Sequence, residues 1–140
     1  ILPAERIPLE VIYRARAYGS FLARYRGYVK PLSPLNLIEL TLKDDSLGDP
    51  LLNPSTAVKL GLVKKAELKQ IEGLAKKATS IVKRTLAKRG LELVDMKLEF
   101  GRVKGKLIIV DELSGDTMRV RDPSKKKFLN QIELAKRLLH

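Results

Sequence analysis

Three charged residues alternate with apolar ones in the stretch LVDMKLEFG, residues 93–101. Asp95, Lys97 and Glu99 occupy every second position. Because a β-strand points successive side chains to opposite faces, the three charges would share one face and the apolar residues would face a core. Carboxylates in such a row can bind a metal ion or orient a substrate, and an ammonium can hold a phosphate. Taken alone, the stretch is explained more simply as an amphipathic strand with one solvated face.

The residues that follow predict a β-hairpin, because GRVKG separates LELVDMKLEF from the β-rich segment KLIIVDE. If residues 104–106 form the loop, Glu99 lies opposite Asp111, with Cβ atoms about 4.5–5.5 Å apart. Two carboxylates so close repel each other unless a cation or a proton lies between them. Mg²⁺ is the natural cation, since one or two carboxylates hold it together with substrate phosphates. The alternative for Glu99 and Asp111 is a pair splayed into solvent or balanced by nearby lysines.

The other two charges of the strand would serve a different purpose. Asp95 lies four strand residues from Glu99, about 13 Å along the backbone, so we expect it to contact a substrate rather than the same ion. Lys97 stands between them and can offer a positive charge to a transferring phosphate.

Hydrophobic spacing and turn residues predict the elements around this hairpin. Apolar positions between Lys64 and Arg89 follow helical spacing, and Gly90 is placed as a C-terminal cap. Asn130 as N-cap, with Glu133 three residues later, predicts a final helix. The segment 43–55 is rich in aspartate, glycine and proline, which favours an ordered loop. We therefore expect an α+β fold with strands over 8–14, 35–42, 91–100 and 106–112, a short helix from Ser20, and helices over 64–89 and 130–140.

Composition limits the available chemistry. With 140 residues, of which 44% are hydrophobic, the chain suits one globular core. It has no cysteine, and its single histidine, His140, is the last residue, so any metal must be held by carboxylates. No apolar run is long enough to span a membrane, and the first residues lack the pattern of a signal peptide. We expect a cytoplasmic protein that does not bind membranes.

A net charge of +12 calls for an anionic partner. Nucleic acid is the usual first candidate, but the aromatic residues do not alternate with basic ones, and there is no zinc-ligand or basic-zipper pattern. The Lys and Arg residues of the 64–89 helix are best interpreted as a solvated face. A phosphorylated metabolite suits the charge equally well.

Two longer motifs resemble one known family. LVDMKLEFG and IPLEVIYRARAYGS, residues 7–20, are similar to the two signatures of phosphoribosylaminoimidazole-succinocarboxamide synthase, also called SAICAR synthetase. The segment KDDSLGDP, the pair Asp111 and Glu112, and the segment ending at Arg119 stand in the order and spacing of that family. The resemblance covers residues 7 to about 122. Gly115, where the family usually has proline, and the tail over 122–140 depart from the pattern.

The resemblance implies a two-lobed fold related to ATP-grasp and kinase-like enzymes, with ATP between the lobes. Residues 1–140 would form the C-terminal substrate- and metal-binding lobe without the N-terminal ATP-binding lobe, so this chain alone would be inactive. The family is an ATP-dependent carbon–nitrogen ligase of purine biosynthesis. It joins L-aspartate to the carboxylate of carboxyaminoimidazole ribonucleotide and releases ADP and phosphate. The implied route is an acyl phosphate that the aspartate amine displaces, which depends on positioning and charge neutralisation.

The resemblance also implies roles for the charged strand. Glu99 and Asp111 would bind Mg²⁺ and, with Lys97, the phosphates of ATP. Lys97 would contact the phosphate or carboxylate undergoing transfer, and Asp95 would orient the substrate.

The resemblance further implies that Arg14, Ser20 and Arg119 clamp the phosphate of the ribonucleotide. Guanidinium groups, which give bidentate donors, and a helix starting near Ser20, which adds backbone N–H groups, suit that role. The roles of Lys43, Asp45 and Asp49 in the 43–55 loop have two interpretations. These residues line the nucleotide or aspartate side of the cleft, or they only form the turn.

Two alternatives belong to other classes. One is a basic nucleic-acid-binding module, for which the net charge is the sole support. The other is a catalytically inactive relative that acts as a scaffold, which Gly115 and the divergent tail leave open. The sequence is compatible with a homo-oligomer.

Overall fold

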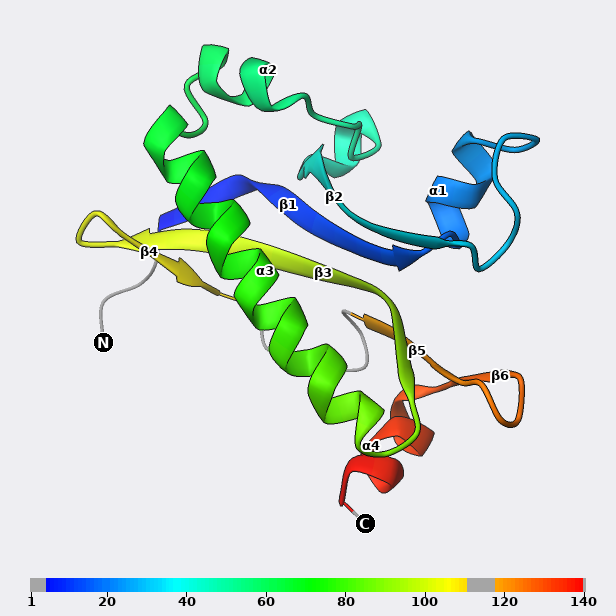
Figure 1. The fold of residues 1–140 in the computed structure, drawn as a ribbon. Helices are drawn as coiled ribbons and strands as arrows, with labels where there is room; N and C mark the ends of the chain where they lie inside the picture. The colour runs from blue at the N-terminus through cyan, green and yellow to red at the C-terminus, as the bar shows by residue number, and fades with distance from the viewer. Residues whose placement is uncertain (1–4, 111–117, 140) are drawn as a thin grey trace.

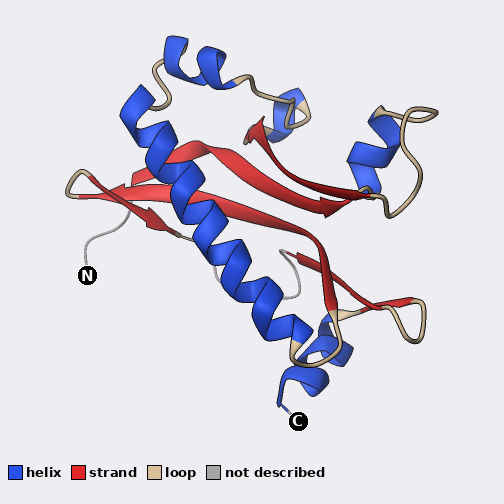
Figure 2. Ribbon diagram, viewed as in Figure 1, coloured by secondary structure: helices blue, strands red, loops and turns tan. Residues whose placement is uncertain are grey.

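The structure is a computed structural model that describes residues 5–110 and 118–139, and these residues form the expected α+β fold (Figure 1; Figure 2). Six strands make one antiparallel sheet in the described part of the chain, in the order β2-β1-β3-β5-β6, with β4 beside the C-terminal half of β3. The strands are β1 (Glu5–Arg16), β2 (Pro34–Leu42), β3 (Glu92–Val103), β4 (Lys106–Ile109), β5 (Met118–Asp122) and β6 (Lys127–Leu129). The helices are α1 (Gly19–Arg24), the 3₁₀ turn η1 (Asp45–Leu47), α2 (Pro54–Lys59), α3 (Lys65–Ala87) and α4 (Gln131–Leu139).

Helix α3 lies across β1 and β3 on one face of the sheet (Figure 1). Its apolar stripe, which includes Leu68, Ile71 and Ala75, joins the core formed by the inward residues of the two long strands. Gly90 ends the helix in a left-handed conformation at φ 70°, and the Leu91 N–H donates to the Leu86 carbonyl. The prediction of a helix over 64–89 capped by this glycine is confirmed. Among the described helices, none is long and apolar enough to cross a membrane.

The hairpin register differs by one residue from the prediction. Val103 pairs with Lys106 and Phe100 with Ile109, so the loop is the two-residue turn Lys104-Gly105 and not residues 104–106. Both turn residues have positive φ, at 52° and 76°, as type I′ turns require. A one-residue slip changes every cross-strand partner. The N–H of Val110 therefore donates to the carbonyl of Glu99, and the predicted pairing of Glu99 with Asp111 is wrong in register; Asp111 itself lies outside the described residues.

Several short elements were not expected. Helix α2 begins at the end of the 43–55 segment that was predicted to be a loop and continues to Lys59. Asn53 is its N-cap and accepts from the Ser55 N–H, and Pro54 follows in the first turn. Strands β5 and β6 form a hairpin around residues 123–126, in the tail that departs from the family pattern. The final helix was predicted correctly, since Asn130 and Glu133 exchange backbone and side-chain hydrogen bonds in a capping box.

An ion pair fastens α3 to the sheet. Arg102 of β3 donates to both carboxylate oxygens of Glu67 in the first turn of α3, at 2.7 and 2.9 Å. The hydrogen bonds from Arg102 lower the pKa of Glu67 from 4.5 to about 2. The contribution of this pair to stability is therefore complete above pH 4.5 and is lost as pH falls toward 2.

We predict that Glu67→Gln lowers the melting temperature at pH 7 and that the gap to the unchanged protein narrows below about pH 4.5. The Glu67 carboxylate of the unchanged protein is then increasingly protonated in the unfolded state, so its ion pair stabilises the fold less, whereas the variant has no carboxylate at this position. Thermal unfolding followed by circular dichroism between pH 7 and pH 3 measures the gap. Glu72→Gln, an exposed position on the same helix, is the control. A gap that stays constant over this range would contradict the assignment.

Candidate functional site

The face of the sheet opposite α3 carries charged side chains in three rows. Directly paired residues of antiparallel strands share a face, and successive rows are two residues, about 6.7 Å, apart. We call this the charged face. Its first row is Arg14, Asp95 and Arg119 from β1, β3 and β5; its second is Glu39, Ile12 and Lys97 from β2, β1 and β3; its third is Thr41, Glu10 and Glu99 from the same three strands.

One carboxylate oxygen joins the first row. The Oδ2 atom of Asp95 accepts from Arg14 at 3.3 Å and from Arg119 at 3.2 Å. Arg14 also donates to the Ser20 Oγ at 2.8 Å and to Glu39 at 3.0 Å. The Arg14 side chain is only 3% exposed, whereas that of Arg119 is 45% exposed. Arg14, Ser20 and Arg119 therefore converge as expected, with Arg119 and Ser20 on the accessible side and Arg14 beneath them.

A β-bulge brings Arg119 opposite Asp95. The pairing of β3 with β5 shifts between Leu93 and Asp95, so that Leu93 faces Val120 and Asp95 faces Arg119. Without the extra residue, Val94, the regular register would place Arg119 opposite that valine and not opposite the carboxylate. Bulges of this kind re-aim side chains next to functional sites.

The two carboxylates that contact Arg14 differ in acidity. Burial raises the pKa of Asp95, against the opposing charges of Arg119 and Arg14. Burial would raise the pKa of Glu39 as well, but hydrogen bonds from Arg24 and Arg14 outweigh it and hold the pKa below its ordinary value. Arg14, Asp95 and Glu39 thus form a compact network of buried opposite charges, and Arg119 joins it from the accessible side.

The third row contains the carboxylate that we expected to bind a metal. Glu99 lies directly opposite Glu10, and both residues are buried, at 6% and 4% exposure. Arg6 donates to Glu99 at 2.9 Å, and the Lys43 ammonium contacts its other oxygen. Lys97 lies 3.4 Å from Glu10. In the described ranges no three acidic or histidine side chains form a metal cluster, and Asp111 is not among those residues.

The three residues of the 43–55 loop take different positions. Lys43 reaches the site through its contact with Glu99. Asp49 accepts from the backbone N–H of Asp44 at 2.8 Å, as a turn-forming aspartate does. Asp45 is exposed in the 3₁₀ turn η1.

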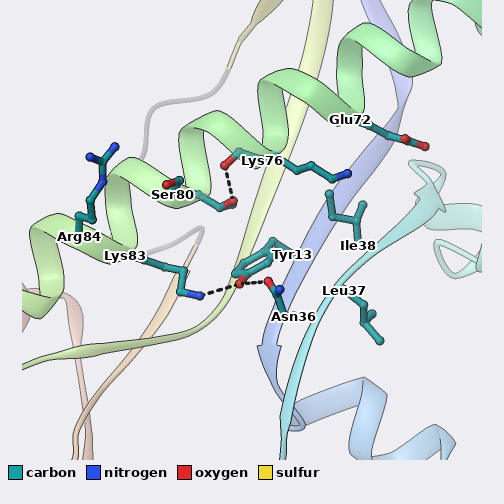
Figure 3. A pocket seen from close by; sticks show the side chains of 10 residues that line it. Tyr13, Asn36, Leu37, Ile38, Glu72, Lys76, Ser80, Lys83 and Arg84 are labelled. Carbon is teal, nitrogen blue, oxygen red and sulfur yellow. Dashed lines mark hydrogen bonds between the residues drawn. The ribbon is translucent and has the colours of Figure 1, made fainter.

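A groove of about 740 Å³ lies on the opposite side of the sheet, between α3 and strands β1 and β2 (Figure 3). Tyr13 at its base donates to Asn36 at 2.7 Å and accepts from Lys83 at 3.0 Å, and Ser80 lies on its rim (Figure 3). None of the described predicted site residues lines this groove. The candidate site is therefore the charged face.

Sequence reasoning missed Glu10 and Glu39 as members of this face. Glu10 sits within the motif IPLEVIYRARAYGS, at the same parity as Arg14, so its position on the same face could have been read from the strand period. Glu39 carries no such signal, because its pairing with Ile12 depends on the register of β1 against β2.

We predict that Arg14→Ala lowers the free energy of unfolding by about 3–5 kcal/mol, because it leaves Asp95 and Glu39 buried without their shared partner. Urea denaturation of the variant measures the loss. Arg26→Ala, which removes an exposed arginine just after α1, is the matched control and should change the free energy by less than about 0.5 kcal/mol. Equal small effects for both variants would show that the network does not stabilise the fold.

Comparison with known proteins gives one consistent answer. The SAICAR synthetase family profile matches residues 2–139. The phosphoribosylaminoimidazole-succinocarboxamide synthase of Pyrobaculum aerophilum is 45% identical over 122 residues, which cover 86% of this chain and 52% of that protein. The crystal structure of the same synthase from Ehrlichia chaffeensis has a TM-score of 0.92 at 29% identity and covers 98% of this chain and 65% of its own. A SAICAR synthetase solved in complex with ADP has a TM-score of 0.87 at 33% identity and covers 97% of this chain and 64% of its own.

The family match runs through both motifs and through the whole described sheet. The chain spans about half the length of the curated relatives it matches. The family match over residues 2–139 and the likeness of the fold show that the chain belongs to the SAICAR synthetase family.

Proposed function

We propose that this chain is the C-terminal, substrate- and metal-binding lobe of a phosphoribosylaminoimidazole-succinocarboxamide synthase of purine biosynthesis. The observation that carries the proposal is the first row of the charged face, where Arg14, Asp95, Arg119 and Ser20 meet within hydrogen-bond distance. The residues that hold the ATP phosphates from the other side would belong to an N-terminal lobe outside these 140 residues. A relative solved with ADP supports nucleotide binding in the family.

The proposed reaction joins L-aspartate to the carboxylate of carboxyaminoimidazole ribonucleotide. A carboxylate is a poor acceptor for an amine, so ATP first phosphorylates it, and the amine of aspartate then displaces phosphate. Catalysis of this kind depends on positioning and charge neutralisation rather than on a protein nucleophile. A chain without cysteine and with its one histidine at the end suits that chemistry.

The phosphate of the ribonucleotide would bind at the first row. Arg119 presents an accessible guanidinium, Ser20 presents an exposed hydroxyl, and Arg14 beneath them adds positive charge. Asp95 holds both arginines and would thereby orient the substrate that they bind. Since this phosphate does not react, its contacts would contribute equally to the ground state and the transition state.

The transferring phosphate would lie farther along the charged face, near Lys97. This ammonium is 50% exposed and lies one row from Asp95. Mg²⁺ would be held by Glu99 and Asp111 together with the ATP phosphates, where it would neutralise charge during transfer. Of this pair only Glu99 lies among the described residues; it is a buried oxygen donor, and Glu10, buried directly opposite it, is a second one that could share the ion. Lys43 and Arg6, which contact Glu99, would then shift toward the substrate phosphates.

The rival functions have weaker support. A nucleic-acid-binding module rests on net charge alone, and the arginines and carboxylates of the charged face are paired with one another. An inactive relative would keep the fold and lose turnover, so a direct assay decides between it and the enzyme.

The assay is ADP release by the full-length protein with Mg-ATP, carboxyaminoimidazole ribonucleotide and L-aspartate, together with detection of the succinocarboxamide product. The proposal predicts product only when all three substrates are present, and no turnover when EDTA removes Mg²⁺. Tight DNA binding that weakens steeply with salt, without turnover, would support the nucleic-acid alternative instead.

We predict that Arg119→Ala raises the Michaelis constant for the ribonucleotide at least tenfold, equivalent to about 1.4 kcal/mol, with little change in the constant for ATP. Arg119→Lys should restore binding only partly, because an ammonium cannot reproduce the bidentate fork. Steady-state kinetics with each substrate varied in turn make the measurement. Kinetics in which only the constant for ATP rises would remove Arg119 from the phosphate site.

A further inference from the structure

The ring of Tyr18 contacts both Arg119 and Phe128. The guanidinium carbon of Arg119 is 5.2 Å from the centre of the Tyr18 ring, within the range of a cation–π contact. The rings of Tyr18 and Phe128 have centroids 4.5 Å apart and are tilted by 37°. An aromatic pair at this separation is attractive. These two contacts link Phe128, through Tyr18, to the arginine of the charged face.

Through Phe128, the divergent tail contacts the side chain that lies next to Arg119. Phe128 belongs to β6, which pairs with β5, the strand that carries Arg119. Its own cross-strand partner is Arg121. The tail after residue 122 lies outside the motifs that resemble the family, so its function is not given by them. The contact of Phe128 with Tyr18 places the tail beside the phosphate site and indicates a role for it there.

The backbone of Gly19, the first residue of α1, also lies close to Arg119. Gly19 has φ +58°, and a Cβ atom built on it would lie 2.1 Å from the Arg119 Nη1 atom. Any larger residue at Gly19 would therefore displace the guanidinium. Arg119 thus has three neighbours: the Asp95 carboxylate, the Tyr18 ring and the Gly19 backbone. Even so, 45% of its side chain is exposed.

An arginine side chain loses conformational freedom when it binds a ligand, and one that is already held loses less. We propose that Tyr18 and Phe128 are positioning residues that pre-organise Arg119 for the phosphate of the substrate, so that the tail takes part in ribonucleotide binding. This inference rests on the proposed function. It extends the site to two aromatic residues that act through Arg119 and do not touch the substrate.

Kinetics of the full-length protein test the inference. Tyr18→Leu should raise the Michaelis constant for the ribonucleotide by about two- to fivefold, the size of a lost cation–π contact at an exposed site. Phe128→Leu, which acts on Arg119 only through the Tyr18 ring, should raise the same constant by about twofold. The turnover number and the constant for ATP should not change. Tyr18→Phe and Phe128→Tyr, which keep the rings, should behave as the unchanged protein. Tyr28→Leu, which removes a tyrosine that is 93% exposed, is the matched control.

A double-mutant cycle separates positioning from general stability. In the Arg119→Ala background, Tyr18→Leu should have no further effect on the ribonucleotide constant, because the arginine that it positions is gone. A purely structural role would instead lower the melting temperature and the turnover number in both backgrounds. If Tyr18→Leu does not fold, Phe128→Leu, which replaces a partly buried ring with a side chain of similar character, carries the same test.

The outcomes are distinct. Turnover by the unchanged protein with unaltered ribonucleotide constants in Tyr18→Leu and Phe128→Leu would overturn this inference and leave the proposed function intact. Additive effects of Tyr18→Leu and Arg119→Ala would also overturn it. Absence of turnover by the unchanged protein would overturn the proposed function and this inference with it.

Discussion

A single carboxylate oxygen, the Oδ2 atom of Asp95, accepts from two arginines that lie on different strands. A buried arginine is costly unless carboxylates compensate it, and Arg14, Asp95 and Glu39 are all at least nine-tenths buried as side chains. This constraint fixes several elements at once. β1, β3 and β5 must be in register, the bulge at Val94 must be present, and α1 must begin where Ser20 reaches Arg14.

The sheet can hold these buried charges because its two faces differ in composition and in what they contact. One face of β1 and β3 is apolar and packs against α3, which fixes the strands in place. The other face carries the charged rows, whose spacing follows from the pleat of the same strands. The rigid apolar layer therefore determines where each charge lies. Functional groups on strands supported in this way are held more precisely than groups on loops.

Local sequence patterns predicted much of this arrangement. The long helix, its Gly90 cap, the capping box of Asn130 and the strand alternation of Asp95, Lys97 and Glu99 are all short-range features, and the structure confirms them. The predicted hairpin register was wrong by one residue. Lys104 adopts a positive φ, which a lysine rarely does and which the sequence therefore does not indicate. The bulge at Val94, the contacts between β5 and β3, and the pairing of Glu39 with Arg14 depend on long-range register, which no local pattern encodes. The prediction that Arg14 and Arg119 lie close together came from the motif resemblance, because their spacing in the sequence alone does not indicate it.

We expect the charge on Asp95 to hold Arg14 and Arg119 in the position that receives the ribonucleotide phosphate. The most direct test is the increase in melting temperature that saturating carboxyaminoimidazole ribonucleotide causes in the full-length protein, compared with Asp95→Asn, which preserves shape and removes charge. We expect the ribonucleotide to raise the melting temperature of the unchanged protein clearly. Asp95→Asn should have a lower melting temperature without ligand and a much smaller increase with it. An equal increase in both proteins would show that the Asp95 charge does not position the arginines.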